Sequence, residues 1–425
     1  MNEEKHHTFR KRRLSFSNIR QTQQQKSRRL SIDERSLGSD SAGAARTATP
    51  NKTVHASELL QQASVSSFLQ KQTLLPPLST PPPIKKKWGR QRTIEKLPSN
   101  EQLPFALDVV GTWSCHGVEP VYEEWSENAT TDEEEVDPPA LMAAKINQDR
   151  GGIICPYGNH PQTALFAVYD GHGFGGELVS QFCLHEIPRR LEQHAEFTTN
   201  LPQALHETFV EVDRALQKET IIEHRYSGTT ACVALLRTHQ LTLAHVGDSR
   251  AVLARRMSPT TLAALALTHD HNPDAPTEHA RIVGAGGFVS LPPGPGLSAR
   301  VWLDEAHTQI GLAMSRSLGD HAVSEVGVIA EPEVSNHKVT KDDEFLVLAS
   351  DGVWEFLSSD DVVQLVAKQL DKGATAACQV LIETAAEKWH EEEGEYRDDI
   401  TAIVVRLQEL WKWMLCGCYV DPPNR

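Results

Sequence analysis

The chain has 425 residues, enough for one large domain or two to three small ones, which excludes a disulfide-stapled miniprotein. Residues 1–97 carry 19 Lys and Arg against 7 Asp and Glu, whereas the remainder carries 23 against 50. A body this acidic disfavours nucleic acid as a substrate or partner. The seven cysteines are scattered and include no CxxC pair, so we expect a reducing compartment and no zinc site.

Residues 1–99 are predicted to form a disordered basic extension rich in Ser, Gln and Pro. They show no sustained period of 2 or 3.6, and the prolines between positions 76 and 83 would break any helix. Ser15 and Ser31 each follow a pair of arginines, which is typical of sites for basic-directed kinases but equally of solvated charge. Lys85–Lys87 likewise suits either a nuclear-import patch or a solubilising stretch.

The start of the chain contains no apolar stretch of signal-peptide length, and no window approaches a membrane-spanning helix. We therefore expect a soluble intracellular protein, a monomer without a transmembrane segment, located in the cytoplasm, the nucleus or both.

Residues 100–408 are predicted to form the folded domain, because apolar runs typical of strands occur there among segments of amphipathic helical spacing. The predicted strands are 165–169, 230–236, 241–246, 250–254, 345–349 and 401–405. The predicted helices are 177–193, 201–218, 277–285, 360–370 and 374–389. Several strands follow one another too closely for a crossover helix, which favours hairpins over a doubly wound parallel sheet. The predicted fold class is therefore α+β, with antiparallel sheets packed together and helices outside.

Two segments interrupt this domain, and a third follows it. Residues 119–139 form an acidic insertion that we expect to be a solvated loop, and residues 284–309, rich in Gly and Pro, are expected to form an exposed lobe or flap. Residues 409–425 are the C-terminal tail. The apolar residues around it favour a helix that caps the core over a membrane-contacting segment S-acylated at Cys416 or Cys418.

Five aspartates lie where apolar strands begin or end: Asp149, Asp170, Asp248, Asp351 and Asp398. A single Asp-Gly pair is usually only a turn. Carboxylates gathered at strand ends would repel one another without cations, and their hard oxygens suit Mg²⁺ or Mn²⁺. A glycine beside an aspartate also lets a backbone carbonyl approach an ion closely. If the strand ends meet, the sequence therefore predicts a site with several metal ions.

A series of blocks resembles, in order, the type 2C family of metal-dependent protein phosphatases. The resemblance covers about residues 104–407. Its blocks are KINQD (145–149), FAVYDGHG (166–173), SGTTACVAL (227–235), AHVGDSRA (244–251), LTHDHNPDAPTEHAR (267–281), LAMSRSLGD (312–320), EPEV (331–334), LVLASDGVWE (346–355) and RDDITAIV (397–404). The resemblance implies an αββα sandwich, in which two antiparallel sheets lie between helix layers, with two Mn²⁺ or Mg²⁺ ions at one end.

The blocks also imply roles for individual residues. Asp170 matches the bridging metal ligand, Gly171 a carbonyl ligand, Asp351 and Asp398 the ligands of the second ion, and Asp149 the water-linked shell. Block alignment selects Asp398 rather than Asp399.

A weaker third metal position is implied as well, at Asp248 and Glu355. The family often carries an Arg that clamps the substrate phosphate, but Ala144 stands at that position here. Lys145 is the nearest replacement for phosphate binding, and it supplies charge without the bidentate fork of a guanidinium. Arg150 and Arg316 are further candidates, although Arg316 is equally suited to an internal ion pair.

The expected reaction follows from the charge of a phosphoserine or phosphothreonine ester. Two ions would acidify a bridging water and neutralise the phosphoryl oxygens, so that hydroxide attacks phosphorus in line without a phosphoenzyme. His172 is the candidate general acid for the leaving alkoxide, with a turn-stabilising histidine as the structural alternative. Asp270, His271 and Asp320 fall in blocks that we treat as structural and leave out of the site.

The leading hypothesis is therefore a protein serine/threonine phosphatase that acts on phosphorylated proteins. One alternative is a catalytically weak pseudophosphatase that binds phosphoproteins, which the presence of the core carboxylates disfavours. Another is a hydrolase of small phosphate esters on the same fold, since fold alone does not fix the substrate.

Overall fold

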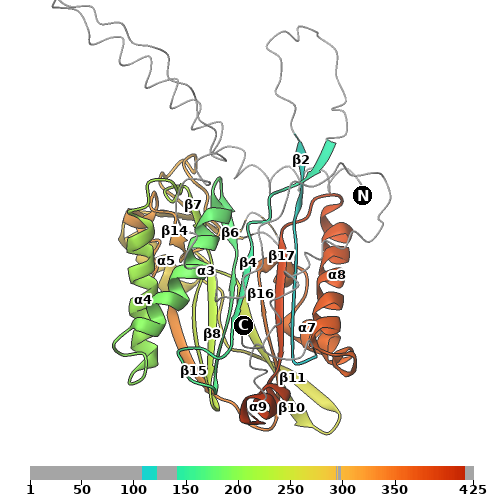
Figure 1. The fold of residues 1–425 in the computed structure, drawn as a ribbon. Helices are drawn as coiled ribbons and strands as arrows, with labels where there is room; N and C mark the ends of the chain where they lie inside the picture. Colours follow the sequence, from blue (N-terminus) through green and yellow to red (C-terminus); the bar gives the residue numbers. More distant parts are fainter. Residues whose placement is uncertain (1–107, 122–140, 293, 295–297, 417–425) are drawn as a thin grey trace, which may run out of the picture. The chain divides into compact units, whose positions relative to one another are not determined.

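The computed structural model describes residues 108–121, 141–292, 294 and 298–416 (Figure 1). The predicted basic extension with Ser15 and Ser31, most of the acidic insertion and the end of the tail lie outside the described residues.

Two antiparallel sheets of five strands each form the centre of the domain. In the first sheet the strand order is β15 (Glu333–Lys338), β9 (Gln240–Val246), β8 (Ala231–Arg237), β5 (Thr163–Tyr169) and β4 (Arg150–Ile154). In the second sheet it is β1 (Val110–Cys115), β17 (Ile400–Arg406), β16 (Asp343–Ala349), β10 (Arg250–Ser258) and β11 (Thr261–Ala266).

The facing sides of the two sheets form one apolar core. Phe166 and Val168 of β5 and Leu346 and Leu348 of β16 belong to this core and are inaccessible to solvent. The intervening residues of β5, such as Tyr169, pack on the opposite side under helices. Because both sides of these strands are covered, their sequences are continuous apolar runs rather than alternating ones.

Helices cover the outer side of each sheet (Figure 1). On the first sheet these are α3 (Gly176–Gln193) and α4 (Leu201–Leu216), and on the second α6 (Asp351–Trp354), α7 (Ser359–Ala367) and α8 (Ala374–Glu393), with the 3₁₀ turn η3 (Leu370–Lys372) before α8. The α+β sandwich expected from the sequence is thus confirmed, and the predicted strands and helices form with ends shifted by a few residues.

A third, small sheet lies beside α3 and has the strand order β14 (Leu318–Gly319), β7 (Ser227–Thr229), β6 (Gly171–Gly173). The sequence analysis did not predict it, because strands of two or three residues leave no periodic signal. A separate hairpin of β2 (Val118–Val121) and β3 (Leu141–Ala144) flanks the acidic insertion.

The segment predicted as an exposed flap belongs to a lobe with its own small core. It contains α5 (Pro276–Gly284), the hairpin of β12 (Phe288–Ser290) and β13 (Arg300–Trp302), and the 3₁₀ turn η2 (Ser324–Val326). Ile282, Val301 and Val328 are buried at its centre. The lobe is therefore held together by packing.

The chain leaves β17 directly into α9 (Leu407–Cys416), which begins two residues before the predicted start of the tail. Leu407, Leu410 and Met414 on this helix are buried in the core between the two sheets. In the part of the chain that the structure describes, none of the helices is both long and apolar enough to span a bilayer.

Candidate functional site

The five aspartates singled out from the sequence border strands that end at the same edge of the sandwich. Asp170 follows β5, Asp248 follows β9, and Asp351 follows β16, whereas Asp149 and Asp398 precede β4 and β17. In an antiparallel sheet the end of one strand adjoins the start of its neighbour, as Tyr169 pairs with Arg150 and Ala349 with Ala402. This geometry brings the carboxylates from both sheets to one place.

Burial and mutual repulsion perturb these carboxylates strongly. Burial, and then the charge of Asp399, raise the pKa of Asp149 to about 7. Burial and the neighbouring charge of Asp270 raise the pKa of Asp248 to about 6. The pKa values of Asp170 and Asp351 are also raised, by burial and by the other aspartates of the cluster. The protein thus concentrates negative charge where water cannot screen it.

The donor set fits divalent cations. One carboxylate oxygen each of Asp149, Asp248 and Asp351 is buried without a hydrogen-bond partner. Gly171 leaves room for close backbone approach, since a Cβ there would lie 2.4 Å from the Gly176 carbonyl oxygen. Unpartnered hard oxygens in a buried carboxylate cluster are what Mg²⁺ or Mn²⁺ requires.

Asp398 and Asp399 have different surroundings, although they are adjacent. Asp398 forms an ion pair with Lys145 Nζ, and its charge is among those that raise the pKa of Asp170. Asp399 accepts the backbone N–H groups of Gly117 (2.5 Å) and Gln148 (2.9 Å), and Lys145 Nζ lies 3.3 Å from it. Both charges therefore lie near the cluster, and Asp399 in addition holds the loops around it.

Glu355, the residue after α6, is exposed at the margin of the cluster. Its charge contributes to the raised pKa values of Asp248 and Asp351, so the structure brings it near both.

His172 lies on β6, directly after Asp170 and Gly171, and its Nε2 is 2.7 Å from Asp320 Oδ2. Burial alone would lower the pKa of His172, but the charges of Asp320 and Asp248 outweigh it, so the pKa is raised. Asp320 had been left out of the site as structural. In the structure Asp320 contacts the candidate acid directly.

Arg150 and Arg316 are both occupied internally. The Arg150 guanidinium donates to the backbone carbonyls of Asn147 and Asp149 and to Gln181. Arg316 binds both carboxylate oxygens of Glu278, at 2.9 and 2.6 Å. Of these three cations, Lys145 is the one that forms an ion pair with Asp398 of the cluster, and its pKa is raised, since Asp398 and Asp399 outweigh the effect of burial.

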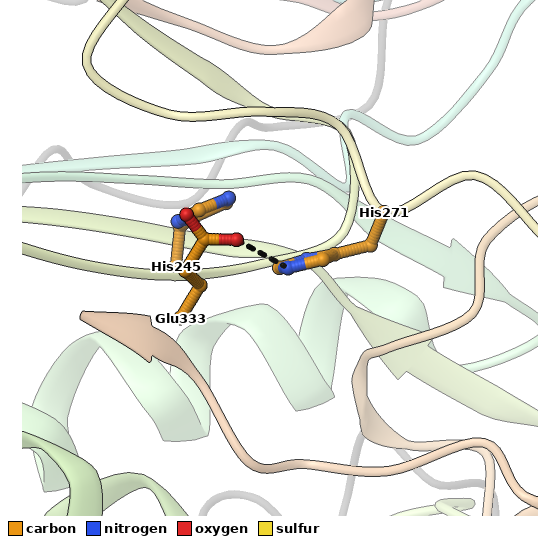
Figure 2. Close-up of side chains that lie close together, drawn as sticks. All are labelled: His245, His271 and Glu333. Atoms are coloured by element: carbon orange, nitrogen blue, oxygen red, sulfur yellow. Dashed lines mark ion pairs between the residues drawn. The ribbon is translucent and has the colours of Figure 1, made fainter. Parts of the chain in front are cut away.

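A second group of polar side chains consists of His245, His271 and Glu333 (Figure 2). Their potential ligand atoms lie within 4.8 Å of one another, and the two rings stack with centroids 4.5 Å apart. Burial and the neighbouring His245 and Arg316 lower the pKa of His271 to about 3, so its ring is neutral at pH 7.

Hydrogen bonds determine which nitrogen of each ring carries the proton. The N–H of Gly247, the residue before Asp248, donates to His271 Nδ1 at 3.1 Å, so the His271 proton is on Nε2, which faces Glu333 at 3.8 Å. His245 Nε2 donates to the His269 carbonyl oxygen at 2.8 Å. His271 in this tautomer has no lone pair free for a metal ion, because Nδ1 accepts the Gly247 N–H and Nε2 carries the proton, so its ring supports the Gly247 turn.

Comparison with known proteins agrees with this geometry. The family model described as "Protein phosphatase 2C" matches residues 144–394, more than half of the chain. The chain belongs to the protein phosphatase 2C family. It is accordingly a metal-dependent protein serine/threonine phosphatase, as the sequence blocks predicted.

Relatives and solved structures extend the comparison. "Probable protein phosphatase 2C 72" of Arabidopsis thaliana is 37% identical over 275 residues, which cover 62% of this chain and 82% of the relative. "Probable protein phosphatase 2C 12" of rice is 40% identical over 309 residues, covering 62% and 78%. The crystal structure of a serine-threonine phosphatase 2C from Toxoplasma gondii superposes with a TM-score of 0.57 at 21% identity, covering 71% of this chain and 96% of that one. This structural likeness shows the fold.

Proposed function

We propose that Asp149, Asp170, Asp351 and Asp398, with the Gly171 carbonyl, hold two Mn²⁺ or Mg²⁺ ions, and that Asp248 and Glu355 bind a third, weaker ion. The observation that supports this is a set of three buried carboxylate oxygens without partners, which come from three different strand ends, at Asp149, Asp248 and Asp351. Their charges are too close together to be stable at pH 7 without cations.

The reaction proposed is hydrolysis of phosphoserine and phosphothreonine esters of proteins. Divalent ions bound among the carboxylates would neutralise phosphoryl oxygens and make water a better nucleophile. The residues of the chain supply the rest. His172 protonates the leaving alkoxide, and Lys145 attracts the phosphate, both from positions next to the carboxylates.

The sequence of the basic N-terminal extension supports a proposal about how the enzyme is regulated and where in the cell it acts. Its two Arg-Arg-Leu-Ser sites, at Ser15 and Ser31, suit basic-directed kinases. We propose that the enzyme acts as a monomer in the cytoplasm, the nucleus or both, where phosphorylation of the extension can alter its contacts.

The test is hydrolysis of a phosphothreonine peptide by the full chain in Mn²⁺ or Mg²⁺, with EDTA as the reference. Asp351→Asn should abolish turnover, whereas Asp371→Asn, an exposed carboxylate on η3, should leave it unchanged. Calorimetric titration with Mn²⁺ should find two tight ions and one weak ion. Activity of Asp351→Asn equal to that of the parent would refute the assignment.

A further inference from the structure

His172 and Asp320 come from distant parts of the chain and meet across the small sheet. β6 and β14 both pair with β7, and the register places Gly228 of β7 opposite both His172 and Gly319. His172 Nε2 and Asp320 Oδ2 approach to 2.7 Å, with only 11% and 7% of the two side chains exposed. A hydrogen bond to a carboxylate in so dry a setting fixes the orientation of the imidazole ring.

Asp320 is itself held from several sides. Ser317 Oγ donates to the same carboxylate oxygen at 2.6 Å, and the Asp320 N–H donates to the Ser227 carbonyl at 2.9 Å. Asp320 adopts a φ of +48°, a left-handed conformation that costs energy for a residue with a side chain. The surrounding contacts maintain this conformation and keep the carboxylate directed at His172.

The space around the pair is also restricted. A Cβ on Gly228 would lie 2.2 Å from Asp320 Oδ2 and 2.7 Å from His172 Nε2. The turn that carries Asp320 is anchored on α4, since Asp213 accepts the Gly319 N–H at 2.9 Å. The close packing at Gly228 and the hydrogen bond from Gly319 to Asp213 thus both restrict the positions of the His172 and Asp320 side chains.

Because Nε2 is committed to Asp320, Nδ1 is the nitrogen of His172 left for chemistry. Nδ1 is buried and makes no hydrogen bond of ordinary geometry among the described residues, although the backbone of Asp170 lies near the ring. An unpartnered buried donor is costly, and a water molecule or a substrate atom can complete its hydrogen bond. His172 comes directly after Asp170 and Gly171, and the charge of Asp248 acts on its ring, so the ring lies close to the carboxylates among which a phosphate ester would bind.

We propose that Asp320 is a positioning residue for the dephosphorylation reaction: it holds His172 by Nε2 so that Nδ1 donates the proton to the leaving group. This inference rests on the proposed role of His172 as general acid. In the step, water forms a new P–O bond and releases one proton to solvent. The ester P–O bond breaks, and the serine or threonine oxygen takes the Nδ1 proton. His172 keeps its Nε2 proton on Asp320 and regains the Nδ1 proton from solvent.

The test compares two substrates that differ in their need for an acid. A phosphothreonine peptide releases a basic alkoxide that must be protonated, whereas p-nitrophenyl phosphate releases a stabilised phenolate that needs no proton. Asp320→Ala, which removes the acceptor of the His172 Nε2 proton, should lower kcat for the peptide about 10²-fold while changing kcat for p-nitrophenyl phosphate less than about 3-fold. The Mn²⁺ concentration for half-maximal activity should stay the same in this variant.

Three further variants make the result specific. Asp371→Ala removes an exposed carboxylate on η3, away from His172, and should show no substrate-selective loss. The double variant His172→Ala/Asp320→Ala should be no slower on the peptide than His172→Ala, since a residue that acts through His172 has no effect without it. If Asp320→Ala does not fold, Ser317→Ala removes one of the contacts that hold Asp320 and should give a smaller loss of the same selectivity.

The outcomes separate the two proposals. If His172→Ala slows both substrates equally, His172 is not the acid and the proposed function fails at that residue. If His172→Ala is selective for the peptide but both Asp320→Ala and Ser317→Ala are not, the acid role stands and the role of Asp320 is wrong. An equal selective loss in Asp371→Ala would also overturn it, by showing that removing a carboxylate far from His172 suffices.

Discussion

Removing one charge from the aspartate cluster should stabilise the metal-free protein. Asp149 is only 3% exposed, and its pKa rises from the usual 3.8 to about 7 on folding. The folded protein therefore keeps this proton to a higher pH than the unfolded chain does. The resulting contribution to stability is complete below about pH 4 and is lost as the pH rises to about 7.

The size of the effect follows from the shift. A difference of about 3 pH units at ~1.4 kcal/mol per unit corresponds to about 4 kcal/mol at pH 8. In Asp149→Asn the amide oxygen can still accept the Ser350 hydroxyl, which donates to Asp149 Oδ2 at 2.7 Å. The variant should thus lose the charge and keep the hydrogen bond.

The assay is urea unfolding of EDTA-treated protein at pH 4.5 and pH 8, with and without excess Mn²⁺. We expect Asp149→Asn to exceed the parent by up to about 4 kcal/mol at pH 8 without metal, and by much less at pH 4.5. With Mn²⁺ the parent should gain more than the variant, because metal binding stabilises the folded state. A metal-free variant that is no more stable than the parent at pH 8 would refute the reasoning.

Three other changes test the packing around the site. Glu278→Gln should lower the free energy of unfolding by about 3 kcal/mol at pH 7 in urea titrations, because it leaves Arg281 and Arg316 without their buried carboxylate. Since the pKa of Glu278 is depressed in the folded protein, this difference between variant and parent should shrink as the pH falls below about 4.5. Gly228→Ala should lower peptide turnover with little change in the far-UV spectrum, since its methyl group would displace Asp320 and His172; full activity would show that the pair tolerates movement. Leu410→Ala should lower the free energy of unfolding by about 3 kcal/mol in urea titrations, because Leu410 of α9 is buried in the core between the sheets. A change below about 1 kcal/mol would show that α9 does not unfold together with the rest of the domain.

The sequence revealed those parts of the fold whose side chains repeat or cluster locally. Strands such as β5 and β16 are covered on both sides, so their apolar runs were plain, and α4 carried a clear amphipathic pattern. The exposed edge strand β15 and the strands of the small sheet gave no such signal. Their hydrogen bonds are made with segments far away in the chain, which local periodicity does not report.

The same limit applies to the site. The aspartates could be found because each ends or begins a strand, and strand ends of antiparallel sheets meet. Asp320 could not be assigned, because it lies 148 residues from His172 and its role depends on a left-handed turn. A signal was present in the Leu-Gly-Asp sequence of 318–320, since a glycine before an aspartate is typical of turns. Arg150 and Arg316 were candidates by charge, and only their partners in the fold showed otherwise.

The carboxylates of the proposed metal centre come from both halves of the sandwich. Asp149 and Asp170 border β4 and β5, whereas Asp351 and Asp398 border β16 and β17. The distance between these two pairs is therefore set by the thickness of the apolar layer between the sheets. Core side chains such as Phe166 and Leu348 therefore influence the distance between the two pairs of carboxylates, although they belong to the core between the sheets. Substitutions that change the volume of that layer could therefore alter the metal preference of this enzyme without changing any ligand.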